Sequence, residues 1–457
     1  MSNKKLLYMV GPFSTRSGYG DHARDIFHSF YDLDKFDIKV MDTRWGDTPR
    51  NALKEHDEND KKLLDCIMDT PQLDRQPDIC VDVRIPNEFQ PVGKFNIGIT
   101  AGIETTAVSP AWLEGVNKMD LNIVPSEHSK QGFTSSHYDK MQELPNGEKQ
   151  KIGELKLEKP MEVLFEGVHE EQFKKVDASI SDSDIVKTLD EIKESKCFLF
   201  VGLWGNGDFG EDRKDVGRMI RTFYSTFINH PNPPGLILKT SGSNFSIMDK
   251  VDCEKKIHSI KSQFPKNMKL PNVYLLHGEL DKNEMNILYN HKKVRCMLSF
   301  THGEGFGRPL LEATMVGLPV IASNWSGQLD FLDEEYSILL NGEMGKVPKS
   351  QVWKDIIMEE SQWFNVNEEQ ASKILKFAHK NFFDMGVRAK KLMNKNREKF
   401  THKKMTEKLG EILDSYGDRM PKQSTLKLPT LKKIETPKLK KDLPKLKSVK
   451  LPKLKKD

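Results

Sequence analysis

Two glutamates separated by seven residues, Glu304 and Glu312, are the side chains whose type and spacing most clearly suggest chemistry. Glycines alternate through the same stretch at positions 303, 305 and 307. Ionised carboxylates accept hydrogen bonds from the hydroxyls of a sugar or a ribose but repel free phosphate. Glycines let backbone amides approach a ligand, and the N-terminal end of a following helix attracts an anionic group. The stretch therefore predicts a ligand that carries both hydroxyls and a phosphate, such as a nucleotide sugar.

The elements that must position these carboxylates can be predicted from the neighbouring residues. Residues 294–300 form a short, mostly apolar run that is typical of a buried strand. Pro309 suits the first position of a helix, and Gly317 suits its end. This pattern therefore predicts a strand, a glycine loop, a helix and a second strand. Glu304 would lie in the loop, and Glu312 would lie about one turn inside the helix.

The same stretch resembles the retaining, nucleotide-sugar-dependent glycosyltransferases of GT-B fold, in particular family 4, also called glycosyl transferases group 1. Two glutamates separated by seven residues mark that family. The resemblance covers the chain from about residue 5 to residue 400. It implies an α/β protein in which two Rossmann-like, doubly wound domains face a cleft. It also implies that Glu312 holds the donor ribose and that Glu304 acts on the transferred sugar. The donor-binding residues of the intervening loop would be Gly305, Phe306 and Gly307.

Members of this family grip the donor diphosphate with an arginine and a lysine after the first strand of the second domain. Lys214 fits the lysine position, and Arg213 is adjacent to it rather than upstream. Lys239, which ends another strand-like run, would reach the same phosphates. Fixed positive groups stabilise the charge on a departing diphosphate without a metal. An ordinary basic helix start is the alternative interpretation of Arg213 and Lys214.

Residues 273–280 resemble the family segment that contacts the nucleotide base through backbone atoms, and Gly278 and Leu280 are the candidates there. The apolar stripe that follows, Met285, Leu288 and Tyr289, has helical spacing. We interpret this stripe as core rather than as part of a site.

In the first domain, residues 5–10 and 36–40 predict two strands around an amphipathic helix. A glycine loop at the carboxyl end of the first strand is where doubly wound sheets bind ligands. By itself the loop is equally well explained as a plain turn. The resemblance implies that it faces the cleft, near donor phosphate or acceptor. Its candidate residues are Arg16, Gly18, Tyr19 and Gly20.

The acceptor side has weaker candidates. Many family members place a histidine near the reacting sugar, and no histidine of this chain clearly matches that position. Glu104 is the candidate for that neighbourhood, and a capping or solvated glutamate is the alternative. Ser126 and His128, which follow another predicted strand, are secondary candidates.

Length favours two domains, because 457 residues exceed one ordinary core. The expected division gives an acceptor-side domain over residues 1–170 and a nucleotide-sugar-binding domain over 171–384. A terminal helix over 385–420 would cross back to the first domain.

Composition agrees with a globular protein, since 37% of the residues are hydrophobic and 30% are charged. No apolar run approaches the roughly 18 residues that a membrane span needs. Five cysteines without paired spacing indicate neither a disulfide framework nor a zinc site, which favours a cytoplasmic location. Two Asp-x-Asp pairs, at 32–34 and 182–184, occur in polar contexts, so we expect no metal and no cofactor.

The last segment, residues 421–457, differs in charge and pattern from the rest. From residue 422 onward, thirteen lysines and three acidic residues give +10, so the remainder carries −6 within a total of +4. Proline recurs there every seven or eight residues with lysine and leucine, which predicts a disordered, extended tail. It is either a tether for nucleic acid or another polyanion, or a solvating extension. A third, less favoured interpretation is contact with an anionic membrane surface, which the prolines oppose because they interrupt an amphipathic helix.

The sequence therefore predicts a retaining glycosyltransferase that moves a hexose or pentose from a nucleoside-diphosphate sugar to an acceptor hydroxyl. The acceptor would be a glycan or a lipid-linked saccharide. One alternative is a DNA-modifying glycosyltransferase that acts on hydroxylated bases, with the basic tail tethering DNA. Another is a non-catalytic, polyanion-binding module of GT-B fold.

Overall fold

The computed structural model describes residues 4–145, 147–178, 181 and 183–421. The predicted disordered tail therefore lies outside the described residues, except for Pro421, as does Asp182 of the second Asp-x-Asp pair. Within the described ranges, no helix combines the length and apolar character needed to cross a membrane.

The first domain is built on a six-stranded parallel sheet with strand order β2-β1-β3-β4-β5-β8. All residues of β3 and β4 are buried, and most of them are apolar, because helices cover both faces of such sheets. The antiparallel pair β6 and β7 lies outside this sheet. The strands are β1 (Lys5–Gly11), β2 (Phe36–Asp42), β3 (Ile79–Val83), β4 (Phe95–Ile99), β5 (Leu121–Val124), β6 (Tyr138–Glu143), β7 (Lys149–Leu155) and β8 (Met161–Val163). The helices are α1 (Gly18–Asp32), α2 (Glu58–Leu64), α3 (Pro110–Val116) and α4 (Glu127–Ser135).

The second domain has its own six-stranded parallel sheet, in the order β11-β10-β9-β12-β13-β14. Numbered along this domain, the order is 3-2-1-4-5-6, the Rossmann arrangement, whereas the first domain begins 2-1-3, as flavodoxin-like sheets do. The strands are β9 (Cys197–Val201), β10 (Gly235–Lys239), β11 (Val273–Leu276), β12 (Val294–Ser299), β13 (Val320–Ser323), β14 (Ile338–Leu340) and the antiparallel pair β15 (Gly342–Lys346) and β16 (Gln362–Val366). The helices are α5 (Asp184–Asp190), α6 (Val216–Phe227), α7 (Ile247–Ser262), α8 (Lys282–Asn290) and α9 (Arg308–Met315).

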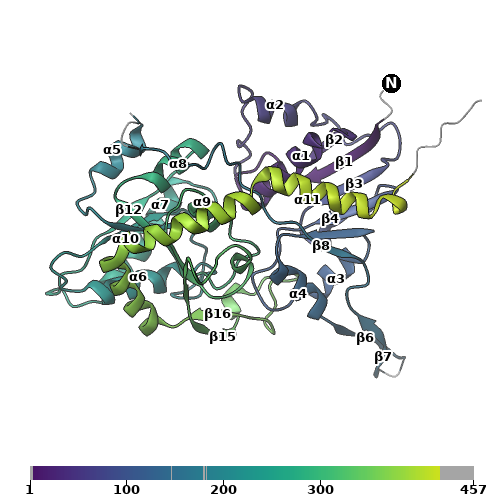
Figure 1. Cartoon of the computed structure of the whole chain (residues 1–457). Helices are drawn as coiled ribbons and strands as arrows, with labels where there is room; N and C mark the ends of the chain where they lie inside the picture. The colour runs from purple at the N-terminus through teal and green to yellow at the C-terminus, as the bar shows by residue number, and fades with distance from the viewer. Residues whose placement is uncertain (1–3, 146, 179–180, 182, 422–457) are drawn as a thin grey trace, which may run out of the picture. The chain divides into compact units, whose positions relative to one another are not determined.

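Two long helices end the described chain. The first, α10 (Glu368–Lys399), packs on α6 and α9 of the second domain, with a non-helical residue at Asn381. The second, α11 (His402–Ser415), lies beside α1 and buries Met405 and Leu409 in the first core (Figure 1). The return to the first domain therefore begins after Phe400, whereas residue 385, where we expected the crossing helix to begin, lies within α10.

The chain passes between the two sheets twice, and the two passages are hydrogen-bonded to each other. The amide of Val168 donates to the carbonyl oxygen of Phe400 at 2.9 Å, and the amide of His402 donates to that of Val168 at 2.9 Å. Gly167 is required here, because an added Cβ would lie 2.7 Å from the Thr401 carbonyl oxygen.

Candidate active site

The site lies where the strand order of the second sheet reverses. Strands β9 and β12 are parallel neighbours, and in doubly wound sheets ligands bind outside the carboxyl ends at such a point. The loop after β9 carries Arg213 and Lys214, and the loop after β12 carries Glu304. Gly307 then adopts a φ of +97° at the start of α9, a left-handed conformation that favours glycine. The topology therefore brings the predicted cations and the first predicted carboxylate to one edge.

Glu304 is buried against both cations. Lys214 Nζ contacts its Oε1, and Arg213 Nη1 lies 3.3 Å from its Oε2. Its backbone amide donates to Ser326 Oγ at 2.9 Å. Burial alone would raise the pKa of Glu304, but Lys214 and Arg213 outweigh it, so the pKa lies below its ordinary value. Glu304 is therefore a fixed, ionised acceptor.

Arg213 connects this carboxylate to the first domain. Its Nε lies 3.5 Å from Oε1 of Glu104, and its Nη1 donates to the Gly303 carbonyl oxygen at 3.0 Å. Burial lowers the pKa of Lys214, with the charge of Arg213 acting in the same direction and Glu304 opposing them. The structure thus brings together four residues predicted from separate segments: Glu104, Arg213, Lys214 and Glu304.

The backbone around the two cations is held by buried neighbours. Asp215 precedes α6 with a φ of +48°, which turns the chain sharply after Lys214. The His302 amide donates to the Arg213 carbonyl oxygen at 2.9 Å, and the His302 ring stacks on Trp363 with centroids 4.1 Å apart. These contacts fix where the cations project.

Glu312 has a different environment inside α9. Arg308 Nε donates to its Oε1 at 3.2 Å, and the Tyr289 hydroxyl donates to its Oε2 at 3.1 Å. Burial raises the pKa of Glu312, and the opposing charge of Arg308 does not reverse this shift. Tyr289 is buried, as predicted for a core residue, yet its hydroxyl also reaches the site. Helical spacing identifies the core stripe, but it does not show where a hydroxyl points.

The glycine loop that carries Glu304 packs closely against residues of the first domain. A Cβ on Gly303 would lie 2.0 Å from the Glu104 carbonyl oxygen, and one on Gly305 would lie 2.1 Å from that of Ala101. Ser126 Oγ donates to the Gly305 carbonyl oxygen at 2.6 Å. These two glycines therefore allow close approach of the first domain, which is a different use from the ligand approach that we expected.

Phe306 is also placed differently from the prediction. Its side chain is buried in the second core, where its ring lies 5.1 Å from that of Phe331. A phenylalanine inside the core cannot contact a donor directly, so Phe306 anchors the loop instead.

Lys239 is hydrogen-bonded to the segment predicted to contact the nucleotide base. Its Nζ donates to the Gly278 carbonyl oxygen at 2.6 Å, and burial lowers its pKa to about 8. Gly278 has a φ of +113°, and Leu280 packs against the second core. Lys239 therefore supports the segment that we predicted to contact the base, and in this arrangement its ammonium group is engaged there.

The candidate loop of the first domain begins α1 rather than preceding it. Gly18, Tyr19 and Gly20 form the first turn, capped by Ser17. Gly20 is required by close packing, because a Cβ would lie 2.3 Å from the Thr15 carbonyl oxygen, whereas Gly18 faces open space. The Tyr19 hydroxyl is hydrogen-bonded to Thr100 at 2.6 Å.

Two further candidates of the first domain meet the second. Arg16 Nε lies 3.1 Å from Oε2 of Glu279, between Gly278 and Leu280. His128 packs edge-on against Trp325 with centroids 4.6 Å apart, and burial lowers its pKa to about 4. His128 is therefore neutral at physiological pH and lies at the domain contact.

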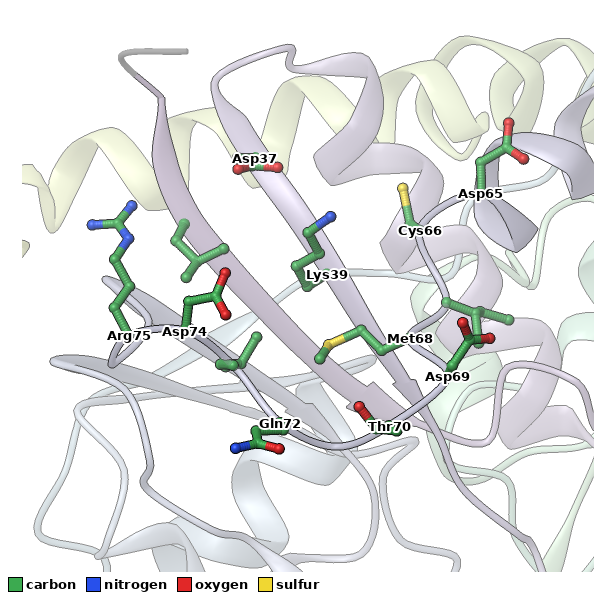
Figure 2. A pocket seen from close by; sticks show the side chains of 13 residues that line it. Asp37, Lys39, Asp65, Cys66, Met68, Asp69, Thr70, Gln72, Asp74 and Arg75 are labelled. Carbon is green, nitrogen blue, oxygen red and sulfur yellow. The ribbon is translucent and has the colours of Figure 1, made fainter. Parts of the chain in front are cut away.

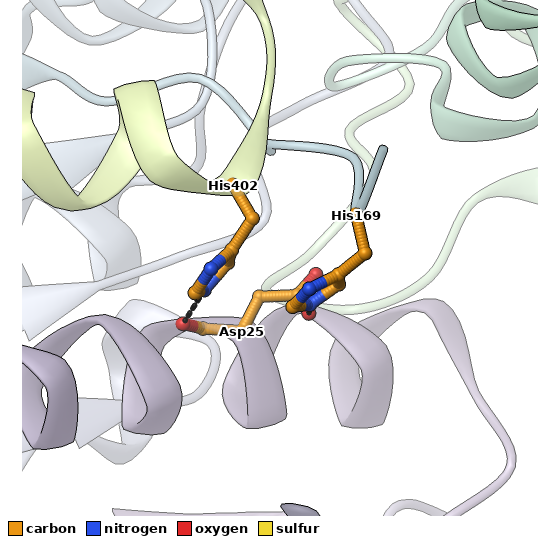
Figure 3. Close-up of side chains that lie close together, drawn as sticks. All are labelled: Asp25, His169 and His402. Atoms are coloured by element: carbon orange, nitrogen blue, oxygen red, sulfur yellow. Dashed lines mark hydrogen bonds and ion pairs between the residues drawn. The ribbon is translucent and has the colours of Figure 1, made fainter. Parts of the chain in front are cut away.

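A cluster that sequence reasoning missed lies near the two chain passages. Asp25, His169 and His402 bring three atoms of metal-ligating type within 4.8 Å of one another (Figure 3). His169 Nε2 lies 3.2 Å from Asp25 Oδ1, and His402 Nε2 lies 3.1 Å from the Asp25 carbonyl oxygen. Arg308 also pairs with Asp25, and a guanidinium beside this carboxylate disfavours a second cation. Hydrogen bonds and this ion pair account for the cluster, so we assign it no ion.

A hollow of about 510 Å³ lies elsewhere, at the β2 edge of the first sheet (Figure 2). Acidic and basic side chains, including Asp37, Lys39, Asp74 and Arg75, share its wall. None of the predicted site residues lines it. This hollow therefore does not coincide with the candidate site.

Comparison with solved structures identifies the class. The Anabaena protein HepE in complex with UDP-glucose aligns with a TM-score of 0.57 at 15% identity, covering 90% of this chain and all of that one. Trehalose 6-phosphate synthase from Burkholderia multivorans gives 0.57 at 12% identity, covering 92% and 100%. Sucrose-phosphate synthase from Thermosynechococcus elongatus gives 0.56 at 11%, covering 91% and 100%.

The chain thus has the GT-B fold of these glycosyltransferases. More particularly, residues 261–361, which include both glutamates, match the family described as Glycosyl transferases group 1. None of the curated proteins matches the chain in sequence. The fold that the sequence predicted is confirmed, and the predicted family resemblance is matched over residues 261–361.

Proposed function

We propose that this protein transfers a sugar from a nucleoside-diphosphate sugar to an acceptor hydroxyl, with retention at the anomeric carbon. The observation that carries the proposal is the convergence of Arg213 and Lys214 on Glu304 at the switch point of the second sheet. Cations suit a diphosphate and a carboxylate suits sugar hydroxyls, so one such cluster matches both parts of the donor.

In the proposed complex, Glu312 binds the ribose and Glu304 binds hydroxyls of the transferred sugar. Arg213 and Lys214 pair with the diphosphate, whose negative charge grows as the glycosidic bond breaks. Because both cations are already held in place by Glu304, little reorganisation is needed when that charge develops. This charge stabilisation comes from the chain's own residues, so the proposed reaction does not require a metal.

The proposed chemical step balances without a separate protein base. The bond between the anomeric carbon and the phosphate oxygen breaks, and the acceptor oxygen bonds to the same face of that carbon. The acceptor proton passes to an oxygen of the leaving diphosphate. We assign Glu104 to the acceptor side of this arrangement, and its ion pair with Arg213 supports the assignment.

For the donor base, we propose uracil, contacted through the backbone near Gly278 and Leu280. The similar protein HepE was solved with UDP-glucose, which supports this choice. For the acceptor, we propose a saccharide, free or lipid-linked. Related folds serve many acceptors, so this part needs an independent test.

The test is a thermal-shift screen against UDP, GDP, ADP and TDP, followed by assays of sugar-nucleotide hydrolysis and transfer. We expect UDP to give the largest stabilisation and Glu304→Gln to abolish most turnover. Glu343→Gln, at an exposed position on β15, is the matched control and should behave as the parent. If no nucleoside diphosphate stabilises the protein, or if Glu304→Gln turns over at the parent rate, the proposal is wrong.

A further inference from the structure

Arg308, the first residue of α9, lies between carboxylates of the two domains. One side of its guanidinium contacts Asp25 Oδ2 on α1, and Nε donates to Glu312 Oε1 at 3.2 Å. The exposed fractions of the Arg308, Asp25 and Glu312 side chains are only 11%, 3% and 12%. The rigid fork of arginine suits such a two-sided contact, which a lysine cannot reproduce. One side chain therefore links the proposed ribose ligand to the first domain.

The charge of Arg308 favours the ionised form of Glu312, which is the stronger hydrogen-bond acceptor. Ribose hydroxyls donate, and an ionised carboxylate can accept from them at both oxygens, whereas a protonated carboxyl group retains less acceptor capacity. Burial raises the pKa of Glu312 and Asp21 acts in the same direction, whereas Arg308 and the Tyr289 hydroxyl oppose the shift. Without Arg308, the buried carboxyl would take up a proton more readily and lose acceptor capacity.

Arg308 in turn depends on Asp25, and Asp25 is fixed from two directions. His169 lies 3.2 Å from its carboxylate, and His402 bonds to its carbonyl oxygen (Figure 3). Burial would raise the pKa of Asp25, but Arg308 and His169 outweigh it and hold the pKa well below its ordinary value. The first-domain partner of Arg308 is therefore ionised and immobile.

We propose that Arg308 and Asp25 are positioning residues for the donor: Asp25 holds Arg308, and Arg308 keeps Glu312 ionised and aimed at the ribose hydroxyls. This inference rests on the proposed function, in which Glu312 binds ribose. It has two consequences. Donor affinity depends on the contact between the domains, and the site prefers a ribonucleotide to one without ribose hydroxyls.

The test measures dissociation constants of UDP and 2′,3′-dideoxy-UDP by calorimetry at pH 7.5, using the full chain. We expect the parent to favour UDP by about tenfold, the value of one good hydrogen bond to a charged group. Arg308→Gln should weaken UDP about tenfold, and Asp25→Asn about threefold, by the same reasoning. Both variants should leave the affinity for dideoxy-UDP within about twofold of the parent, because that ligand cannot use Glu312.

Two further arms separate positioning from general support of the fold. Arg308→Lys keeps the charge but not the fork, so its UDP affinity should lie between those of the parent and Arg308→Gln. In Arg308→Gln, UDP affinity should depend on pH more strongly than in the parent, and it should rise with pH as Glu312 loses its proton. The other groups that face Arg308 and Glu312, namely Asp21, Asp25, His22, Glu166 and Tyr289, are present in both proteins. Arg75→Gln, at an exposed arginine, is the matched control.

The outcomes are distinct. Equal loss of UDP and dideoxy-UDP affinity in the Arg308 and Asp25 variants would overturn the inference, because it would show a general role in the fold. Unchanged UDP affinity in all of them would also overturn it. Failure of the parent to bind either ligand would instead refute the proposed function with uracil, and the inference with it. If Arg308→Gln fails to fold, the inference is tested with Arg308→Lys and Asp25→Asn, by comparing the loss of UDP affinity with the loss of dideoxy-UDP affinity in each variant.

Discussion

Glu304 and Glu312 are the same residue type in one motif, with side chains about equally buried at 9% and 12% exposure. Their electrostatic environments nevertheless differ. Two cations surround Glu304 and lower its pKa, whereas burial prevails at Glu312 and raises its pKa. Spacing places the two carboxylates at one helix entrance, but their neighbours decide how strongly each remains ionised. The comparison suggests a firm anchor for the sugar and diphosphate end, and an adjustable ligand at the ribose end.

The largest effect should come from removing a cation beside Glu304. We expect Lys214→Ala to reduce kcat about 10²- to 10³-fold, as loss of one preorganised charge-stabilising group typically does. Initial rates with UDP-sugar donors, compared with those of the exposed control Lys373→Ala, measure this. A kcat within twofold of the parent would remove Lys214 from the chemistry and leave it only as a partner of Glu304.

Glu304→Gln should reduce kcat/KM roughly 30-fold, since a hydrogen bond to a charged group contributes about 2 kcal/mol. The same substitution leaves two partly buried cations less compensated, so Tm should also fall. Measuring activity well below the Tm of the variant separates the two effects. Full activity together with a lower Tm would mean that Glu304 serves stability alone.

Tyr289→Phe tests the other carboxylate. Loss of its hydroxyl removes one of the two donors to Glu312, so we expect KM for the donor to rise about fivefold, corresponding to about 1 kcal/mol, with little change in kcat. Steady-state kinetics distinguish these parameters. A drop in kcat with constant KM would place Tyr289 on the reaction rather than on ribose binding.

Lowering the pH should also distinguish Glu312 from Glu304. This is the smallest of the effects that we predict. Because the pKa of Glu312 is raised above the ordinary 4.5 and that of Glu304 is lowered, acidification protonates Glu312 first. Donor affinity should therefore fall about threefold as the pH is lowered through the titration of Glu312, since each hydrogen bond that is lost contributes roughly 0.5–1.5 kcal/mol. Calorimetric titration of UDP across that range measures the effect. In Glu312→Gln the profile should be flat, and a profile unchanged from the parent would assign the titration to another group.

Much of the second domain could be predicted, because its signals are local. The strand before Glu304, the helix after Gly307 and the left-handed Gly317 after that helix follow from short-range patterns. Pro309 occupies the second helical position rather than the first, a one-residue difference that patterns do not resolve. The proximity of Arg213, Lys214 and Glu304 followed from the family resemblance, and the sheet order explains it.

The residues that sequence reasoning missed depend on distant contacts. Asp25 and Arg308 are 283 positions apart, and neither has a spacing signal. Phe306 lies in a motif whose neighbours face the site, yet its ring turns into the core, because a single loop residue has no periodicity to show direction. Gly18 and Gly20 suggested a loop, but the Ser17 cap starts the helix earlier. Such features become visible only when both domains are present.

The position of α11 has a consequence for synthesis of the chain. The first sheet is complete once residue 163 has been made, yet α1 still lacks the apolar cover that Met405, Leu409 and Ile412 provide. During translation, we therefore expect this apolar face to remain uncovered until more than two hundred further residues, including the whole second sheet, have been made. A nascent chain paused within α10 should expose it, and transiently exposed apolar surface of this kind is what makes chaperones necessary.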